Sequence, residues 1–373
     1  MTRVLFVSKP IAPPWHDGSK NLVRDIATHL RHARPTVLVT EDAQPLGPSV
    51  ELDAVYASPG RFASGLVSHA RVARRLLRGD PLDLWHFVFA PNARSSAVAR
   101  ACIASRRLAG WAGRVVQTIA SAPRDFRLVR PLLFGDEIVA LGDYTRGRLL
   151  GAGVTRPITV IPPCAADPGP VSSARKDALR RKHALPTGPL VVYPGDYEVS
   201  TGAATTLHAA LEICAAEPDV TCVLACRAKT ARSHEVRAAL EAEAGAAGVS
   251  PRVRHLGEID DMPALLASAR VVVFPVDDLY GKVDVPLVLL EAMALGVPLV
   301  VARGGSLEAL THAALVEPDD APALAAETLA LLRDAPRAAA SAARGRSLYD
   351  ARFSPQGVAD LHDALYARLC GAS

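Results

Sequence analysis

Short runs of apolar, often β-branched residues alternate with longer Ala- and Leu-rich stretches along the whole chain. The runs are continuously apolar rather than alternating in polarity, which is typical of strands covered by helices on both faces of a parallel sheet. The pattern predicts strands in the first half at residues 4–7, 36–39, 84–87, 115–118, 138–141 and 159–161, and in the second half at 190–193, 221–225, 252–256, 271–274 and 299–302.

Proline- and glycine-rich sequence separates the two series of strands. A Pro-Pro dipeptide at 162–163 and a turn sequence at 167–170 precede a charged stretch, a composition typical of an interdomain connection. A chain of 373 residues is longer than a domain with a single hydrophobic core usually is. We therefore expect an α/β protein of two doubly wound, Rossmann-like domains that face a central cleft. The predicted parts are an N-terminal domain (1–167), a linker (168–184), a C-terminal domain (185–354) and a final helix (355–373) that returns to the first domain.

The composition narrows the class of protein. Half of the residues are hydrophobic and 21% are charged, which excludes wholesale disorder. We expect a cytoplasmic protein, because no apolar run is long enough to span a bilayer and the first strand lacks the flanks of a signal peptide. The cysteines show no paired CxxC spacing, which favours free, mostly buried thiols over metal ligands or disulfides; they are Cys102, Cys164, Cys214, Cys222, Cys226 and Cys370.

Charge is distributed unevenly between the two halves. Residues 1–165 hold 22 Lys and Arg against 12 Asp and Glu, a balance of +10, whereas the remainder holds 20 against 26, or −6. The first half is therefore expected to meet an anionic partner. Nucleic acid is not that partner, because aromatic residues do not interleave with the basic ones and no recognised nucleic-acid motif is present.

The segment 286–296 combines a helix pattern with an isolated carboxylate. Pro286 suits the first turn of the helix and Gly296 suits its end, and between them Glu291 is the one polar residue. A carboxylate in such a buried helix is costly unless it is paired. Two vicinal ribose hydroxyls would satisfy both of its oxygens; an arginine or backbone partner inside the core is the alternative.

A second segment has the parts of an anion site. After the strand at 299–302 come Gly304, Gly305 and Ser306, and then a predicted helix. Exposed amides at the positive end of a helix, with no side chains in the way, suit a phosphate. Glycine pairs of this kind are common in α/β proteins, so the segment alone does not identify a function.

Taken in order, these segments resemble GT4-type glycosyltransferases over nearly the whole chain. The resemblance implies the GT-B fold and a retaining hexosyltransferase that moves a sugar from a nucleotide-diphosphate sugar to an acceptor hydroxyl. The acceptor would be a sugar, a polysaccharide, a lipid-linked molecule or another small molecule, held by the N-terminal domain. The matching stretches are 138–145 and 160–163 in the first half, and 255–258, 264–269, 271–275, 289–298, 304–305, 316–319 and 352–354 in the second.

The resemblance also assigns roles in donor binding. It implies that Glu291 binds ribose and that neither a metal nor a cofactor takes part, because amides, a helix dipole and basic side chains neutralise the leaving diphosphate. The nucleotide sugar itself is a substrate. The other residues that the resemblance places at the donor are Gly195 after the first strand of the second domain, Gly257, Glu258 and Ile259 at the base, and Gly304, Gly305 and Ser306 at the phosphates.

The chain departs from the family pattern at two places. The first of the family's paired glutamates is replaced by Val283, so Asp284 either takes over its catalytic role on the donor sugar or simply favours the start of the next helix. The diphosphate clamp reads Asp196 and Thr201 where cations are expected, which is electrostatically unfavourable. The cations that could compensate follow other strand ends, and each could equally be a solvated surface residue; they are Lys282, Arg227 and Lys229.

In the first half, two motifs resemble the acceptor side of the family. Gly18, Ser19 and Lys20 follow the first strand, where the family's loop approaches the sugar phosphate and acceptor; Lys20 could instead support the start of a helix. The stretch from Asp83 to His86 resembles the family's Asp-x-x-His strand, whose histidine lies at the strand end beside the donor sugar. A purely structural histidine is the alternative.

The helix predicted at 63–78 carries four arginines at helical spacing, Arg71, Arg74, Arg75 and Arg78. They form either a solvated face or an interfacial helix that rests on anionic lipid at the inner face of a membrane. The second interpretation suits a lipid-linked acceptor and peripheral membrane contact.

Two rival functions stay open. One is a GT-B enzyme that uses a different phosphorylated donor, and the other is a degenerate, non-catalytic GT-B subunit, which the altered clamp favours. A nicotinamide-dependent oxidoreductase is disfavoured, because no GxGxxG motif follows an early strand.

Overall fold

The computed structural model describes residues 1–13, 15, 17–57, 65–228 and 230–371, which fold into two compact units. The first unit comprises Met1–Ala166, Tyr280–Leu287 and Arg352–Ser373, and the second comprises Asp167–Leu279 and Val288–Ala351. Two segments from the C-terminal half of the sequence therefore belong to the first unit.

The described part of the first unit is built on a seven-stranded parallel sheet in the order β3-β2-β1-β4-β5-β6-β7. Its strands are β1 (Thr2–Val7), β2 (Ala33–Thr40), β3 (Glu51–Tyr56), β4 (Leu84–Phe89), β5 (Arg114–Ile119), β6 (Glu137–Ala140) and β7 (Ile158–Val160). Its helices are α1 (Gly18–His29), α2 (Leu66–Arg78), α3 (Ala93–Leu108), α4 (Asp143–Gly151) and α12 (Pro355–Cys370), with the short 3₁₀ helices η1 (Phe126–Leu128) and η2 (Arg130–Leu132).

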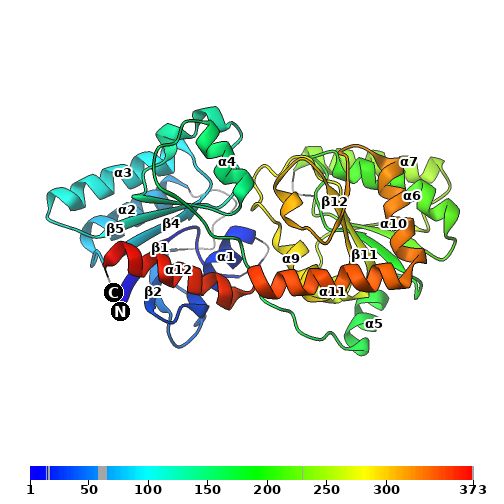
Figure 1. Ribbon diagram of the computed structural model, residues 1–373, viewed down its shortest axis with the longest axis horizontal. Helices are drawn as coiled ribbons and strands as arrows, with labels where there is room; N and C mark the ends of the chain where they lie inside the picture. Colours follow the sequence, from blue (N-terminus) through cyan, green and yellow to red (C-terminus); the bar gives the residue numbers. More distant parts are fainter. Residues whose placement is uncertain (14, 16, 58–64, 229, 372–373) are drawn as a thin grey trace. The chain divides into compact units, whose positions relative to one another are not determined.

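Successive side chains of β4 point to opposite faces of this sheet, and helices cover both faces. Trp85 and Phe87 pack into a core that contains residues of α2 and α3, whereas His86 between them points to the opposite face and meets Tyr366 of α12. On that face α12 packs along α1 (Figure 1). Asp363 of α12 accepts hydrogen bonds from the amides of Arg31 and His32 just after α1, at 2.8 and 3.0 Å.

The second unit has a six-stranded parallel sheet among its described residues, in the order β10-β9-β8-β11-β12-β13. Its strands are β8 (Leu190–Tyr193), β9 (Thr221–Ala225), β10 (Val253–Leu256), β11 (Ala269–Phe274), β12 (Leu299–Ala302) and β13 (Ala314–Val316). Its helices are α5 (Ser173–Lys182), α6 (Gly202–Ala216), α7 (Ala231–Ala246), α8 (Met262–Ser268), α9 (Leu287–Ala294, which starts in the first unit), α10 (Ala321–Arg333) and α11 (Ala335–Arg352), with the 3₁₀ helix η3 (Ser306–Ala309).

The expected α/β fold class of two parallel-sheet, Rossmann-like domains is confirmed. The strands absent from the sequence prediction, β3 and β13, are edge strands that pair with one neighbour each. The expected linker at 168–184 is partly wrong, because it contains α5. Leu179 of this helix is buried, and Arg175 forms two hydrogen bonds of 2.6 and 2.8 Å to Asp261, the N-cap of α8.

Candidate active site

Parallel strands bring the loops after their carboxyl ends to one edge of a sheet, and ligands bind where the strand order reverses. In the first unit the order reverses between β1 and β4, and in the second between β8 and β11. A ligand-binding site is therefore expected in the loops that follow these strands in each unit.

Asp196, which stands where a diphosphate-binding cation was expected, has a structural role in the loop after β8. The carboxylate of Asp196 accepts hydrogen bonds from the amides of Glu198 (3.2 Å) and Val199 (2.8 Å), so it stabilises its own loop. At Gly195 a Cβ would lie 2.0 Å from Cζ of Tyr193, so this glycine is required by ring packing as well as by any ligand. Thr201 precedes α6 and donates to Asp277 of the neighbouring loop at 3.4 Å.

The predicted base loop lies after β10, next to the loop after β9. Gly257 and Ile259 belong to it, and its exposed Glu258 forms an ion pair of 3.3 Å with Arg227. The structure therefore brings together two residues that the sequence assigned separately to the donor. Lys229 lies outside the described residues.

The prediction of a phosphate-binding helix after Gly305 is wrong. The segment from Ser306 to Ala309 forms only the four-residue 3₁₀ helix η3, whose cap makes no side-chain hydrogen bond. Gly304 adopts a positive φ of 88° that favours glycine, and its amide donates to the carboxylate of Glu308 at 2.8 Å. One of the amides expected at a phosphate is thus already satisfied by a protein carboxylate.

Glu291 lies on α9, as the sequence predicts. It is half-buried, while Leu290 and Ala292 beside it are fully buried. Glu291 is therefore not enclosed by the core as its two neighbours are, which is compatible with contact to a ligand hydroxyl.

Asp284 lies in the first unit, not in the C-terminal domain where it was expected. Its side chain is 4% exposed, and it accepts a hydrogen bond of 2.8 Å from Thr145 in the first turn of α4. A Cβ on Gly142, the N-cap of α4, would lie 2.9 Å from Oδ2 of Asp284. Burial raises the pKa of Asp284 to about 6, against the opposing effect of the Thr145 hydrogen bond.

The segment that carries Asp284 lies across several ligand loops of the first unit. Leu287 approaches Gly18 after β1, with 3.7 Å between Cγ and a Cβ built on the glycine. Tyr280 packs against the guanidinium of Arg124 after β5, 4.9 Å from the ring centre. Lys282, a predicted donor cation, belongs to this same segment and is half-buried.

The predicted acceptor loop around Gly18, Ser19 and Lys20 forms the start of α1. Asp17 caps the helix by accepting from the amide of Ser19 at 2.9 Å, and it also binds Lys9 at 2.6 Å. Burial raises the pKa of Asp17, but attraction to Lys9 and the hydrogen bonds from Lys9 and Ser19 outweigh it, so the pKa lies below its usual value. Lys20 is buried, which lowers the pKa of its ammonium group.

Sequence reasoning missed an aromatic–cation cluster in this loop. The ring centre of Trp15 lies 5.8 Å from Nζ of Lys20 and 4.8 Å from Cζ of Arg24. Lys20 and Arg24 are four residues apart on α1 and therefore share a face. That spacing after a tryptophan was the available signal.

The prediction that His86 lies at a strand end beside the donor sugar is wrong. It occupies the third position of β4 with no exposed surface. Its Nδ1 lies 2.7 Å from the hydroxyl of Tyr366, and its Nε2 lies 2.6 Å from that of Thr118. Burial and the neighbouring His362 hold the pKa of His86 well below its usual value, so this histidine attaches α12 to the sheet.

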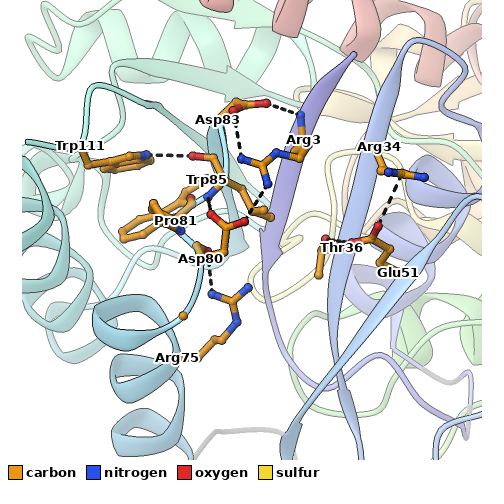
Figure 2. Close-up of polar contacts among 12 residues, drawn as sticks. Arg3, Arg34, Thr36, Glu51, Arg75, Asp80, Pro81, Asp83, Trp85 and Trp111 are labelled. Atoms are coloured by element: carbon orange, nitrogen blue, oxygen red, sulfur yellow. Dashed lines mark hydrogen bonds and ion pairs between the residues drawn. The ribbon is translucent and has the colours of Figure 1, made fainter.

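The four arginines of α2 do not share one role. Arg75 is largely buried and pairs with Asp53. It also donates to the carbonyl of Asp80 at 2.9 Å (Figure 2). Asp80 also binds Arg3 at 2.7 Å, at the amino end of β1. Arg75 is therefore structural, which corrects its assignment to a membrane surface, whereas Arg74 and Arg78 are exposed and Arg71 is half-buried.

Two further observations concern metals and membranes. The described residues contain no cluster of His, Cys, Asp or Glu suited to a metal ion. Within the same part of the chain, no helix has both the length and the apolar character needed to cross a bilayer.

Comparison with known proteins assigns the class. The sequence model of the family Glycosyl transferases group 1 matches residues 188–334, from β8 to the end of α10. A GDP-mannose-dependent monoacylated alpha-(1-6)-phosphatidylinositol monomannoside mannosyltransferase of Corynebacterium glutamicum is 27% identical over 300 residues, which cover 76% of each chain.

Solved structures agree in fold. HepE of Anabaena, crystallised with UDP and glucose, matches with a TM-score of 0.75 at 18% identity, over 99% of this chain and 100% of that one. Sucrose-phosphate synthase of Thermosynechococcus elongatus matches with a TM-score of 0.77 at 19% identity, over 100% of both chains. The fold is GT-B. Residues 188–334 match the sequence model of the Glycosyl transferases group 1 family, in agreement with the resemblance found in the sequence.

Proposed function

We propose that this protein is a retaining hexosyltransferase that uses a nucleotide-diphosphate sugar and transfers the sugar to a hydroxyl of a lipid-linked acceptor. The second unit would bind the donor, with Glu291 on the ribose and the loop from Gly257 to Ile259 at the base. Support comes from the family match over this unit and from a half-buried glutamate on a largely buried helix.

The observation that carries the proposal is the position of Asp284. A buried carboxylate with a raised pKa, held by Thr145 at the carboxyl edge of a parallel sheet, is costly for folding and typical of functional sites. We assign it to the donor sugar's hydroxyls, as a substitute for the family's first glutamate. At neutral pH it is mostly ionised and accepts hydrogen bonds. His86, being structural, has no part in this mechanism.

The acceptor would be bound by the first unit. The side chains of Lys20 and Arg24 lie over the ring of Trp15 after β1. Two ion pairs, Lys9 with Asp17 and Arg24 with Asp25, lie in the same loop and helix. Such a cluster suits a sugar or headgroup that carries a phosphate. The mannosyltransferase relative, whose name specifies a phosphatidylinositol mannoside, supports this acceptor class.

Peripheral contact with a membrane on its cytoplasmic face would bring the enzyme to such an acceptor. The exposed face of α2 carries Leu66, Val67 and Leu77, which are 73%, 69% and 42% exposed. The exposed Arg74 and Arg78 lie on the same helix. Apolar and basic residues together suit an interfacial helix on anionic lipid.

One observation favours a non-catalytic GT-B subunit instead. Two groups expected at the donor, the amide of Gly304 and the guanidinium of Arg227, bind protein carboxylates. A panel of nucleotide diphosphates and nucleotide sugars separates the two functions, because a ligand that binds the folded state raises its melting temperature. We expect one nucleotide family to stabilise the protein; no stabilisation by any of them would favour the non-catalytic function.

A further inference from the structure

A cavity of about 150 Å³ in the first unit is lined by three arginines. Its lining consists of Arg100, Arg130 and Arg156 together with Leu133, Val154 and Thr155. No carboxylate is among these described residues. The cavity is thus a small, strongly basic hollow with one hydroxyl and two apolar side chains.

The cavity lies away from the ligand loops of this sheet. Arg100 belongs to α3, Arg130 starts η2, and Arg156 precedes β7. The chain after η2 runs to the amino end of β5, where the amide of Asp136 donates to the carbonyl of Val115 at 2.7 Å. The site therefore belongs to the amino edge of the sheet, whereas Asp284 and the acceptor loop lie at its carboxyl edge.

Backbone carbonyls hold two of the guanidinium groups in place. Arg100 donates to the carbonyls of Pro131 and Leu133 at 2.8 and 2.7 Å, and Arg156 donates to that of Gly135 at 2.6 Å. Across the described residues, no carboxylate forms an ion pair with any of the three arginines. Carbonyl partners orient these groups but leave their positive charges uncompensated.

Three guanidinium groups around one hollow repel each other, and an anion between them removes that repulsion. Guanidinium presents paired donors that match the oxygens of a phosphate. We propose that this cavity binds a phosphate group, at a site separate from that of the donor nucleotide. The phosphate comes either from a free phosphorylated molecule or from the headgroup of an anionic phospholipid.

The test uses Arg130→Gln, because Arg130 lines the cavity while Arg100 and Arg156 also hold the loop. Arg127→Gln is the matched control: it removes the same charge three residues away from a side chain that is 93% exposed. Inorganic phosphate is titrated calorimetrically at low salt, and phosphatidylcholine vesicles with and without phosphatidylglycerol are used in a cosedimentation assay.

We expect Arg130→Gln to weaken binding about tenfold or more, as for a lost charge-assisted contact, and Arg127→Gln to change it less than about twofold. A loss confined to phosphate identifies a free ligand, and a loss confined to phosphatidylglycerol vesicles identifies a lipid. The proposal is overturned if the wild type binds neither probe, if Arg130→Gln has no effect, or if Arg127→Gln loses as much. Nucleoside diphosphate affinity, measured in the same variants, stays unchanged if the two sites are separate.

Discussion

Asp284 is a carboxylate that the fold holds at an energetic cost. Because burial raises its pKa from 3.8 to about 6, the folded state binds its proton more tightly than the unfolded state does. Its contribution to stability is therefore favourable below pH 3.8 and is lost as the pH rises through 6. At neutral pH the ionised group destabilises the fold by roughly 1–3 kcal/mol.

We predict that Asp284→Asn raises the melting temperature at pH 7.5, has little effect at pH 4, and lowers activity strongly. The asparagine keeps an acceptor for Thr145 but removes the buried charge. Thermal unfolding at the two pH values measures the effect, with Asp143→Asn on the exposed first turn of α4 as the control. A lower melting temperature at pH 7.5 would show that the ionised carboxylate stabilises the fold.

A substitution at Glu291 tests its proposed role in binding the donor ribose. We predict that Glu291→Gln lowers the affinity for the stabilising nucleoside diphosphate by about 1.5–3 kcal/mol, the usual contribution of a charged hydrogen bond, and leaves the melting temperature of the free protein nearly unchanged. Titration calorimetry measures the first quantity. The exposed Glu212 on α6, changed to Gln, is the matched control. Unchanged affinity together with lower stability would assign Glu291 to the core.

The side chains show how far sequence reasoning extends. Glu291 was identifiable because it is the one charge in an apolar helix. His86 was misjudged because its partners, Thr118 and Tyr366, lie 32 and 280 residues away in sequence, and no local pattern reports them. The loop carboxylate of Asp196 satisfies amides two and three residues later, a local turn that the sequence did contain.

Among the helices, α12 depends on a buried cluster of titratable groups. His86 and His362 have ring centres 5.3 Å apart and are both buried against Tyr366, and Asp363 directly follows His362 on α12. Burial lowers the pKa of His362 to about 3 and that of His86 well below 6.5. Because the neutral forms are favoured in the fold, their contribution is present above pH 6.5 and is lost as the pH falls toward 3.

We predict that the melting temperature of the wild type falls between pH 7 and pH 5, and that His362→Leu reduces this fall. Among the described residues, Nδ1 of His362 has no hydrogen-bond partner, so the replacement removes no hydrogen bond from this nitrogen. The same change at the exposed His32 should leave the pH dependence as in the wild type. Equal slopes for all three proteins would exclude the cluster as the origin of acid sensitivity.

The exposed face of α2 makes a prediction about lipid. The double variant Arg74→Glu, Arg78→Glu should reduce cosedimentation with phosphatidylglycerol vesicles about tenfold or more, since each basic residue near such a surface contributes roughly 1 kcal/mol. The exposed Arg232 and Arg344 of the second unit, changed together to Glu, form a charge-matched control. Equal losses in the two variants would indicate a general charge effect rather than binding by α2.

Strands were predictable where apolar runs are continuous, and not where they are short or polar at the sheet edge. The run Thr221–Ala225 matches β9 residue for residue. In contrast, β3 has one buried residue, Tyr56, and lies at the edge of the sheet, where it pairs with β2 alone. The sequence of α5 was interpreted as a linker because it is highly charged and contributes a single buried residue, Leu179, to the core.

At the level of the whole chain, the two-domain α/β architecture followed from periodicity, but the division of the chain did not. Residues 280–287 return to the first unit, where Asp284 meets Thr145. Their apolar pattern resembles that of any buried segment. Contacts between residues far apart in sequence, such as that of Asp284 with Thr145, 139 residues away, show to which core the segment belongs.

The proposed reaction is metal-independent transfer of a hexose from a nucleotide-diphosphate sugar. Its most direct test is to incubate the protein with the nucleotide sugar that stabilises it, a lipid extract and EDTA, and to follow nucleotide release and the anomeric configuration of the glycolipid product. We expect sustained release in EDTA and a product with the configuration of the donor, because amides and basic side chains neutralise the leaving diphosphate. Inversion would contradict the retaining mechanism, and activity that returns only with magnesium or manganese would contradict the neutralisation. The absence of both binding and release would contradict the enzyme itself.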